Sequence, residues 1–219
     1  MANRPLYLSK GETLQPVKVQ EIDFVFYNGF SITQKRRSID SLHQAAHSKK
    51  TELGFNQILE ISSKSLQPLG VSLSAFNLQL NVAENVNSVE TFFQGSKVFE
   101  AGGPFTHLYL QTAREAKKYP ELKSSGAIIH FDLYGQIWPL NPTTLFYDWL
   151  YLKALSQDTQ LADEIMQFDA FTDIEFNPKK SLNSQAYSAA LFVSLTKKGI
   201  LADVLESVDA YQAFSLSNN

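Results

Sequence analysis

Three polar residues with complementary chemistry occur close together in the middle of the chain. Glu90, Gln94 and Lys97 follow one another at spacings of four and three residues. On an α-helix such residues share one face, so an acid, an amide and an amine would be presented together. A carboxylate stabilises the positive charge that develops when a ribose C1–N bond breaks, and a desolvated amine can attack the same carbon. The spacing is compatible with glycosidic bond cleavage, although by itself it is more typical of a solvated helix face.

Other patterns that could carry chemistry are weaker. His43 and His47 have the i, i+4 spacing of two metal ligands, but no Glu follows His43 as in the H-E-x-x-H arrangement, so we expect an exposed polar face. The chain contains no cysteine, which excludes thiolate metal sites and cysteine nucleophiles. The run Gln34–Arg37 is compatible with phosphate binding and equally with a solvated basic turn. The sequence therefore predicts neither a metal ion nor a cofactor.

The composition indicates one folded unit. The 219 residues are 44% hydrophobic and 19% charged, well away from the composition of disordered chains, and their number predicts a single domain over residues 1–219. The formal net charge of −3 excludes a positive field over the whole surface, so any contact with nucleic acid must be local. The first residues lack the apolar stretch of a signal peptide, and no long apolar run follows. We therefore expect a cytoplasmic protein without a membrane segment.

The hydrophobic pattern predicts the elements that must position these side chains. The class that it favours is α+β, a predominantly helical single domain with short strands. Alternating or β-branched runs predict strands, and capped apolar stripes predict helices. The expected strands are 17–27, 58–61, 74–80 and 127–133, and the expected helices are 31–46, 88–99, 143–155, 160–168 and 185–196.

Several motifs in a fixed order resemble the NADAR superfamily of YbiA-like proteins over about residues 58 to 195. The motifs are Leu73-Ser74-Ala75-Phe76-Asn77, the S-x-E-x-x-F-Q-x-x-K element from Ser88 to Lys97, Phe171-Thr172-Asp173, and Gln185 at the start of an apolar helix. Two motifs depart from the usual pattern: Phe171-Thr172-Asp173 replaces Trp-Gly-Asp, and Ala75-Phe76-Asn77 replaces Asn-Phe. Asn28–Ser31, Leu59–Ser65 and Phe176–Ser181 are similar to the branch encoded beside DarT-type DNA ADP-ribosyltransferase toxins.

The resemblance implies a NADAR-like fold and an enzyme that cleaves N-glycosidic bonds. Members of the toxin-linked branch remove ADP-ribose from guanine and act as antitoxins. Transferred residue by residue, the resemblance implies the catalytic residues Glu90, Lys97 and Asp173. It implies substrate binding by Lys64, Ser74, Phe76, Asn77, Gln94 and Gln185. Lys97 is the first candidate for a covalent intermediate with the sugar and Lys64 the second, while Phe76 would stack on a base or ribose.

The leading hypothesis is an ADP-ribosyl glycohydrolase that acts on ADP-ribosylated guanine in DNA or RNA, releases ADP-ribose and neutralises a DarT-type toxin. A second hypothesis is an N-glycosidase of phosphorylated ribosylamine metabolites, and a third is an antitoxin that binds the toxin without catalysis. A groove would favour a polymeric substrate, and a closed pocket would favour the metabolite. The basic residues expected along such a groove are Lys35, Arg36, Arg37, Lys179 and Lys180.

Overall fold

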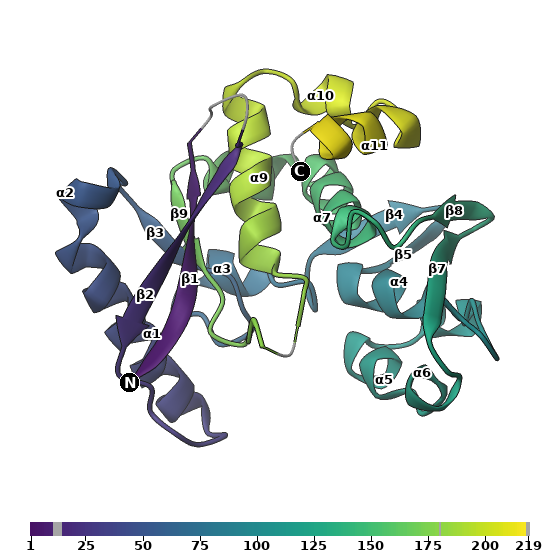
Figure 1. Ribbon diagram of the computed structural model, residues 1–219, viewed down its shortest axis with the longest axis horizontal. Helices are drawn as coiled ribbons and strands as arrows, with labels where there is room; N and C mark the ends of the chain where they lie inside the picture. The colour runs from purple at the N-terminus through teal and green to yellow at the C-terminus, as the bar shows by residue number, and fades with distance from the viewer. Residues whose placement is uncertain (11–14, 180, 218–219) are drawn as a thin grey trace. The chain divides into compact units, whose positions relative to one another are not determined.

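The computed structural model, drawn in Figure 1, describes residues 1–10, 15–179 and 181–217. The chain divides into two compact units. Unit 1 contains Met1–Ser74 and Gln160–Asp203, and unit 2 contains Ala75–Thr159 and Val204–Asn219. The expectation of one domain over residues 1–219 stays a prediction. Lys180, one of the expected basic residues, lies outside the described residues.

A four-stranded sheet forms the centre of unit 1, with the strand order β2-β1-β9-β3. Only the pair β3–β9 is parallel; β1 pairs antiparallel with both β2 and β9. The strands are β1 (Ala2–Ser9), β2 (Val17–Phe24), β3 (Ile58–Glu60) and β9 (Ala170–Thr172). The helices are α1 (Ile32–Ser48), α2 (Lys50–Leu53), α3 (Pro68–Ser72) and α9 (Gln185–Lys197), while α8 (Thr159–Ile165) and α10 (Leu201–Val204) lie at the boundaries of the unit.

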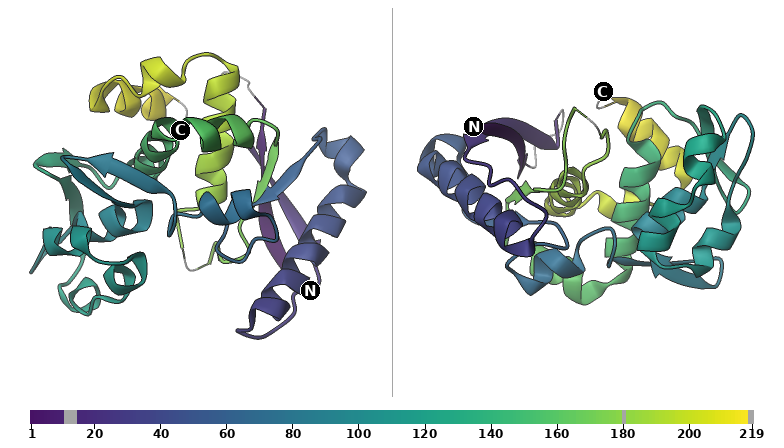
Figure 2. Two further views of the ribbon diagram at one scale, coloured as in Figure 1. Left: turned by 180° about the vertical axis from the view of Figure 1, so that it is seen from behind. Right: turned by 90° about the horizontal axis from the view of Figure 1, so that it is seen from below.

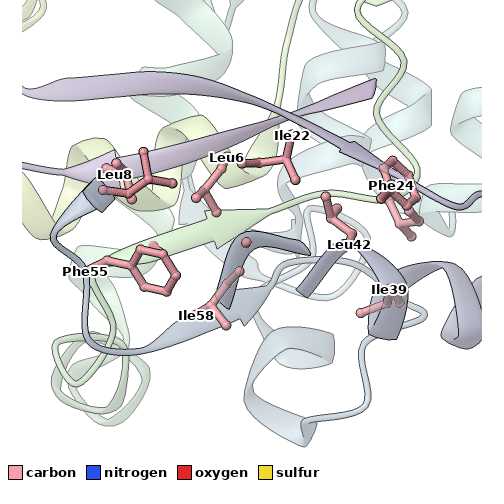
Figure 3. Close-up of a cluster of buried hydrophobic side chains, with 12 residues drawn as sticks. Leu6, Leu8, Ile22, Phe24, Ile39, Leu42, Phe55 and Ile58 are labelled. Atoms are coloured by element: carbon pink, nitrogen blue, oxygen red, sulfur yellow. The ribbon is translucent and has the colours of Figure 1, made fainter. Parts of the chain in front are cut away.

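Alternation along β1 explains why helices cover both faces of this sheet. Leu6 and Leu8 are fully buried in a cluster with Leu42 of α1 (Figure 3). Tyr7 lies between them in sequence and therefore points to the other face. There its ring contacts the ring of Tyr187 on α9, with 5.7 Å between ring centroids. Seen from behind in Figure 2, α1 lies in front of the strands.

Unit 2 combines two small sheets with short helices. The strands are β4 (Gln79–Val82) and β5 (Asn85–Ser88), which form a hairpin, and β6 (Lys97–Phe99), β7 (Ile128–Leu133) and β8 (Gln136–Trp138), which form a meander. The helices are α4 (Val89–Gly95), the 3₁₀ turn η1 (Thr106–Leu110), α5 (Ala113–Lys118), α6 (Glu121–Ser124), α7 (Leu145–Gln157) and α11 (Val208–Ser217).

The α+β class is confirmed, but the expected predominance of helix is overstated because the described residues contain three separate sheets. Two element predictions are wrong. The segment expected as a strand over 74–80 is largely a turn that follows α3, and the strand begins at Gln79. The helix expected over 88–99 ends at Gly95, and Lys97 opens the strand β6 instead.

Candidate functional site

Helix α4 is buried along its whole length, and this burial positions the first group of predicted site residues. Ser88 caps the helix by accepting a hydrogen bond from the backbone N–H of Thr91. The ring of Phe93 packs between those of Phe131 and Tyr147, at centroid distances of 5.3 and 5.2 Å. A Cβ atom added at Gly95 would lie 2.5 Å from the ring of Tyr109, so only glycine permits this approach. The polar residues of α4 are therefore held inside a rigid apolar environment.

A continuous chain of polar contacts runs from this helix to two lysines, and we call Glu90, Gln94, Lys97 and Lys117 the Glu90 cluster. The ammonium of Lys97 donates to Oε1 of Gln94 at 2.7 Å. Nε2 of Gln94 donates in turn to Oε1 of Glu90 at 3.0 Å, and the ammonium of Lys117 lies 3.1 Å from the same oxygen. Within the described part of the chain no ion pair joins Glu90 to Lys97, because Gln94 lies between them. The amine and the carboxylate are thus linked without neutralising each other directly.

The surroundings of Lys97 favour a reactive amine. Burial is the largest influence and lowers the pKa of Lys97 to about 8, because the charged ammonium is poorly solvated. The carboxylate of Glu90 raises this pKa and the ammonium of Lys117 lowers it. The Lys97 ammonium also lies over the ring of Phe93, 4.7 Å from its centroid. A substantial fraction of Lys97 is therefore a neutral, nucleophilic amine slightly above neutral pH.

Phe76 belongs to the same neighbourhood through Lys117, whose ammonium lies 4.8 Å from the centroid of the Phe76 ring. The Phe76 side chain is half-buried rather than fully enclosed in the core, so part of its surface is accessible to a ligand. The next residue, Asn77, is exposed, and its carbonyl accepts a hydrogen bond from Gln79. Phe76 thus has the accessibility that stacking requires.

The second group of predicted site residues lies in unit 1, at the ends of two strands. β3 and β9 run parallel and pair Glu60 with Thr172, so these two side chains leave the same face of the sheet. The hydroxyl of Thr172 donates to Oε2 of Glu60 at 2.6 Å, and the backbone N–H of Ile174 donates to Oε1 at 2.8 Å. Both Glu60 and the adjacent Asp173 are buried.

We call Glu60, Thr172, Asp173, Gln185 and His43 the Asp173 cluster. Oδ1 of Asp173 accepts from the backbone N–H groups of Glu175 and Phe176, at 3.0 and 3.1 Å. The side chain of Gln185 forms a further hydrogen bond to Asp173. Burial is the largest influence and the negative charge of Glu60 adds to it, so that the pKa of Asp173 is raised to about 8. Burial also raises the pKa of Glu60.

His43 has a defined role in this cluster, contrary to the expectation of an exposed polar face. Its Nε2 lies 2.9 Å from Oγ1 of Thr172. Because the Thr172 hydroxyl gives its proton to Glu60, it can only accept from His43, which fixes the Nε2–H tautomer. Burial lowers the pKa of His43 to about 4, consistent with a neutral ring. No group of three or more potential metal ligands occurs among the described residues.

The remaining predicted site residues have less specific surroundings. Lys64 lies on the turn after β3, where its ammonium contacts the hydroxyl of Ser63 at 3.1 Å. Ser74 is buried, and its hydroxyl has no hydrogen-bond partner among the described residues. The sequence reasoning missed Lys117, Glu60 and His43 as members of the two clusters. Of these, Glu60 had the strongest signal, because it lies in the motif Leu59–Ser65.

The comparisons with known proteins identify a family for the chain. The family model of the DarT1-associated NADAR antitoxins matches residues 2–219. No match was found among curated proteins. No helix among the described residues has the length and apolar character that crossing a membrane requires.

Proposed function

The chain belongs to the DarT1-associated NADAR antitoxin family, and from this premise we propose that it is a glycohydrolase that removes ADP-ribose from guanine in nucleic acid. The association of the family with DarT1 implies a DarT-type toxin as partner. The observation that carries the enzymatic part is the Glu90 cluster, where the Lys97 amine, with a pKa of about 8, is linked through Gln94 to a buried carboxylate.

The chemistry proceeds in two stages. The neutral amine of Lys97 forms a bond to C1 of the ribose as the bond from C1 to guanine breaks. The electron pair of that bond passes to guanine, which leaves with a proton given up by the newly bonded nitrogen. The sugar ring then opens to an imine on Lys97, and water releases ADP-ribose and the free amine. The charge of Glu90 stabilises the positive charge that develops on the ribose.

The Gln94 amide and the Lys117 ammonium act on this chemistry by positioning. Gln94 donates to Glu90 and accepts from Lys97, so a single side chain fixes the orientation of both. Lys117 adds positive charge near Lys97, which favours the neutral amine. A desolvated lysine next to a second cation is an established way of obtaining an amine nucleophile.

The decisive experiment is incubation of the protein with an oligonucleotide that carries ADP-ribose on guanine, followed by mass measurement of the products. We expect unmodified oligonucleotide and free ADP-ribose, with many turnovers for each protein molecule. Borohydride added during turnover should reduce the imine and leave ADP-ribose attached to a peptide that contains Lys97. The proposal would be contradicted if no ADP-ribose were released, or if the release stopped at one molecule of ADP-ribose for each protein molecule.

An unmodified phosphorylated ribosylamine is the matched alternative substrate. If the protein hydrolysed it and left the modified oligonucleotide intact, the metabolite N-glycosidase would be the correct function. Neutralisation of the toxin without any release of ADP-ribose would leave the purely binding antitoxin.

A further inference from the structure

The loop between β2 and α1, together with the first turns of α1, concentrates positive charge and aromatic rings in a chain with net negative charge. Residues 25–37 read V-F-Y-N-G-F-S-I-T-Q-K-R-R and contain three cationic and three aromatic residues but no acidic one, against a net charge of −3 for the whole chain. In Figure 1 this segment is the dark loop beside the N-terminus that leads into α1. Such a local excess of positive charge attracts a polyanion even when the whole protein does not.

Cations and rings are already paired within this segment. The guanidinium carbon of Arg37 lies 4.0 Å from the centroid of the Tyr27 ring. The ring of Phe26 is flanked by Arg4 at 5.9 Å and by Lys35 at 5.7 Å. The backbone N–H of Tyr27 is held by the hydroxyl of Ser38 on α1 at 2.9 Å. The rings are therefore fixed to the first turns of the helix rather than moving freely.

Phe30 differs from the other rings because its side chain is completely exposed, with a relative accessibility of 103%. It follows Gly29, whose φ of +133° suits glycine at this bend. Ile32, at the start of α1, is also exposed, at 47%. An exposed ring in a segment that also carries arginine side chains can stack on an unpaired base while the cations contact phosphates.

This surface is connected to the Asp173 cluster within unit 1. The ammonium of Lys35 lies 2.9 Å from the carboxylate of Glu175, whose backbone N–H donates to Asp173. A strand lying along the surface would therefore lead toward one of the two clusters with predicted site residues.

We infer that this basic–aromatic surface of unit 1 binds single-stranded nucleic acid. Its residues are Arg4, Phe26, Tyr27, Phe30, Lys35, Arg36 and Arg37. The role in presenting substrate rests on the proposed function, but the binding itself does not. A single strand is favoured over a duplex because aromatic rings can stack only on unpaired bases. In addition, a chain with a net charge of −3 provides little electrostatic attraction for the dense phosphate charge of a duplex.

The test is fluorescence anisotropy with an unmodified 12-nucleotide single strand, as DNA and as RNA, and with a DNA duplex of the same sequence. We expect the single strands to bind more tightly than the duplex. Phe30→Ala should weaken single-strand binding roughly 5-fold or more, since the lost stacking of one base is worth about 1–3 kcal/mol. This variant should keep the wild-type melting temperature because its ring contributes nothing to the core.

Charge reversal provides the matched pair of variants. Arg36→Glu with Arg37→Glu should abolish measurable binding. Lys49→Glu with Lys50→Glu, where α1 ends and α2 begins, changes the net charge equally and should alter binding less than about twofold. Wild-type binding by the Arg36/Arg37 variant or by Phe30→Ala would overturn the inference, and so would equal affinity for duplex. Loss of toxin association with intact oligonucleotide binding would overturn it in favour of a protein partner.

Activity separates this inference from the proposed function. ADP-ribosylated guanosine monophosphate has no flanking strand, so Phe30→Ala should hydrolyse it as the wild type does and show a raised KM only on the modified oligonucleotide. Normal strand binding without release of ADP-ribose from either substrate would refute the proposed function and leave the binding surface supported.

Discussion

Glu90 and Asp173 are both buried carboxyl groups, yet their neighbours differ in charge. Glu90 is contacted by the ammonium of Lys117 and by the amide of Gln94, which links it to a second ammonium on Lys97. Asp173 instead lies beside another buried carboxyl group, Glu60, and its hydrogen-bond donors are neutral. Burial alone therefore does not determine the chemical role of a carboxyl group. The charges of the neighbouring side chains determine it as well.

The consequence of this difference is a division of proton chemistry between the two units. The two ammonium groups supply positive charge to the Glu90 cluster, which can therefore keep a carboxylate in an apolar environment. In the Asp173 cluster the pKa values of both Asp173 and Glu60 are raised, so this pair of carboxyl groups retains a proton at neutral pH. One unit thus presents a negative charge beside an amine, and the other presents a proton donor in a buried position.

The largest effect should follow the loss of the nucleophile. Lys97→Met preserves the apolar stem and removes the amine, so we expect the rate of ADP-ribose release to fall more than ~10⁴-fold, together with the borohydride-trapped adduct. Lys64→Met removes the second candidate amine and should keep the trapped adduct on Lys97, whatever it does to substrate binding. An adduct that persisted in Lys97→Met and disappeared in Lys64→Met would assign the covalent role to Lys64.

Glu90→Gln should lower the rate ~10²–10⁴-fold, because it removes the negative charge at nearly constant volume. The Gln oxygen can still accept from Gln94, so the melting temperature should change little. Steady-state rates on the modified oligonucleotide measure the effect. A tenfold lower rate corresponds to an activation free energy that is ~1.4 kcal/mol higher. If more than about a tenth of the wild-type rate remained, the role of Glu90 would be structural.

The sequence predicted the parts of these clusters that depend on local geometry. Glu90 and Gln94 lie four residues apart on one helix and form the expected contact. Lys97 reaches Gln94 although the helix has already ended, because the tight turn after Gly95 leaves its side chain on the same side. Helix α1 begins after Ser31, the predicted cap residue.

The contacts that the sequence did not predict are distant along the chain. Glu60 and Thr172 are 112 residues apart, and their pairing exists only because β3 and β9 are adjacent and parallel. Lys117 meets Glu90 through the packing of α5 against α4, and no local pattern distinguishes it from other exposed lysines. The strand order of a mixed sheet cannot be read from hydrophobic periodicity, which reports only which face of each element is buried.

The pH dependence should report the charges around Lys97. Since only the neutral amine is nucleophilic, kcat/KM should rise with pH and level off above the pKa of Lys97, with the midpoint of the rise at about pH 8. Lys117→Met removes a charge that lowers this pKa and should move the midpoint to higher pH, whereas the residual activity of Glu90→Gln should show a lower midpoint. If the two midpoints did not move in opposite directions, a group other than Lys97 would determine the pH dependence.

The smallest effect concerns the stability of the Asp173 cluster. Because the folded-state pKa of Asp173 is about 8, above its value of ~3.9 in an unfolded chain, the folded state binds the proton more tightly. The contribution of this group to stability therefore falls as the pH rises from about 4 to about 8 and is constant above that range. Asp173→Asn has no such proton, so its Tm relative to that of the wild type should rise by several degrees across the same pH range.

Glu60→Gln is the informative comparison, because it removes the other charge of the same pair. An amide at position 173 keeps an oxygen for the backbone N–H groups of Glu175 and Phe176, but an amide at position 60 places N–H groups where the Thr172 hydroxyl donates. Glu60→Gln should therefore gain less in Tm than Asp173→Asn, or lose stability. If Asp173→Asn melted at or below the wild-type temperature at pH 8, the attraction of Arg4 for an ionised Asp173 would outweigh burial, and the two clusters would both hold carboxylates.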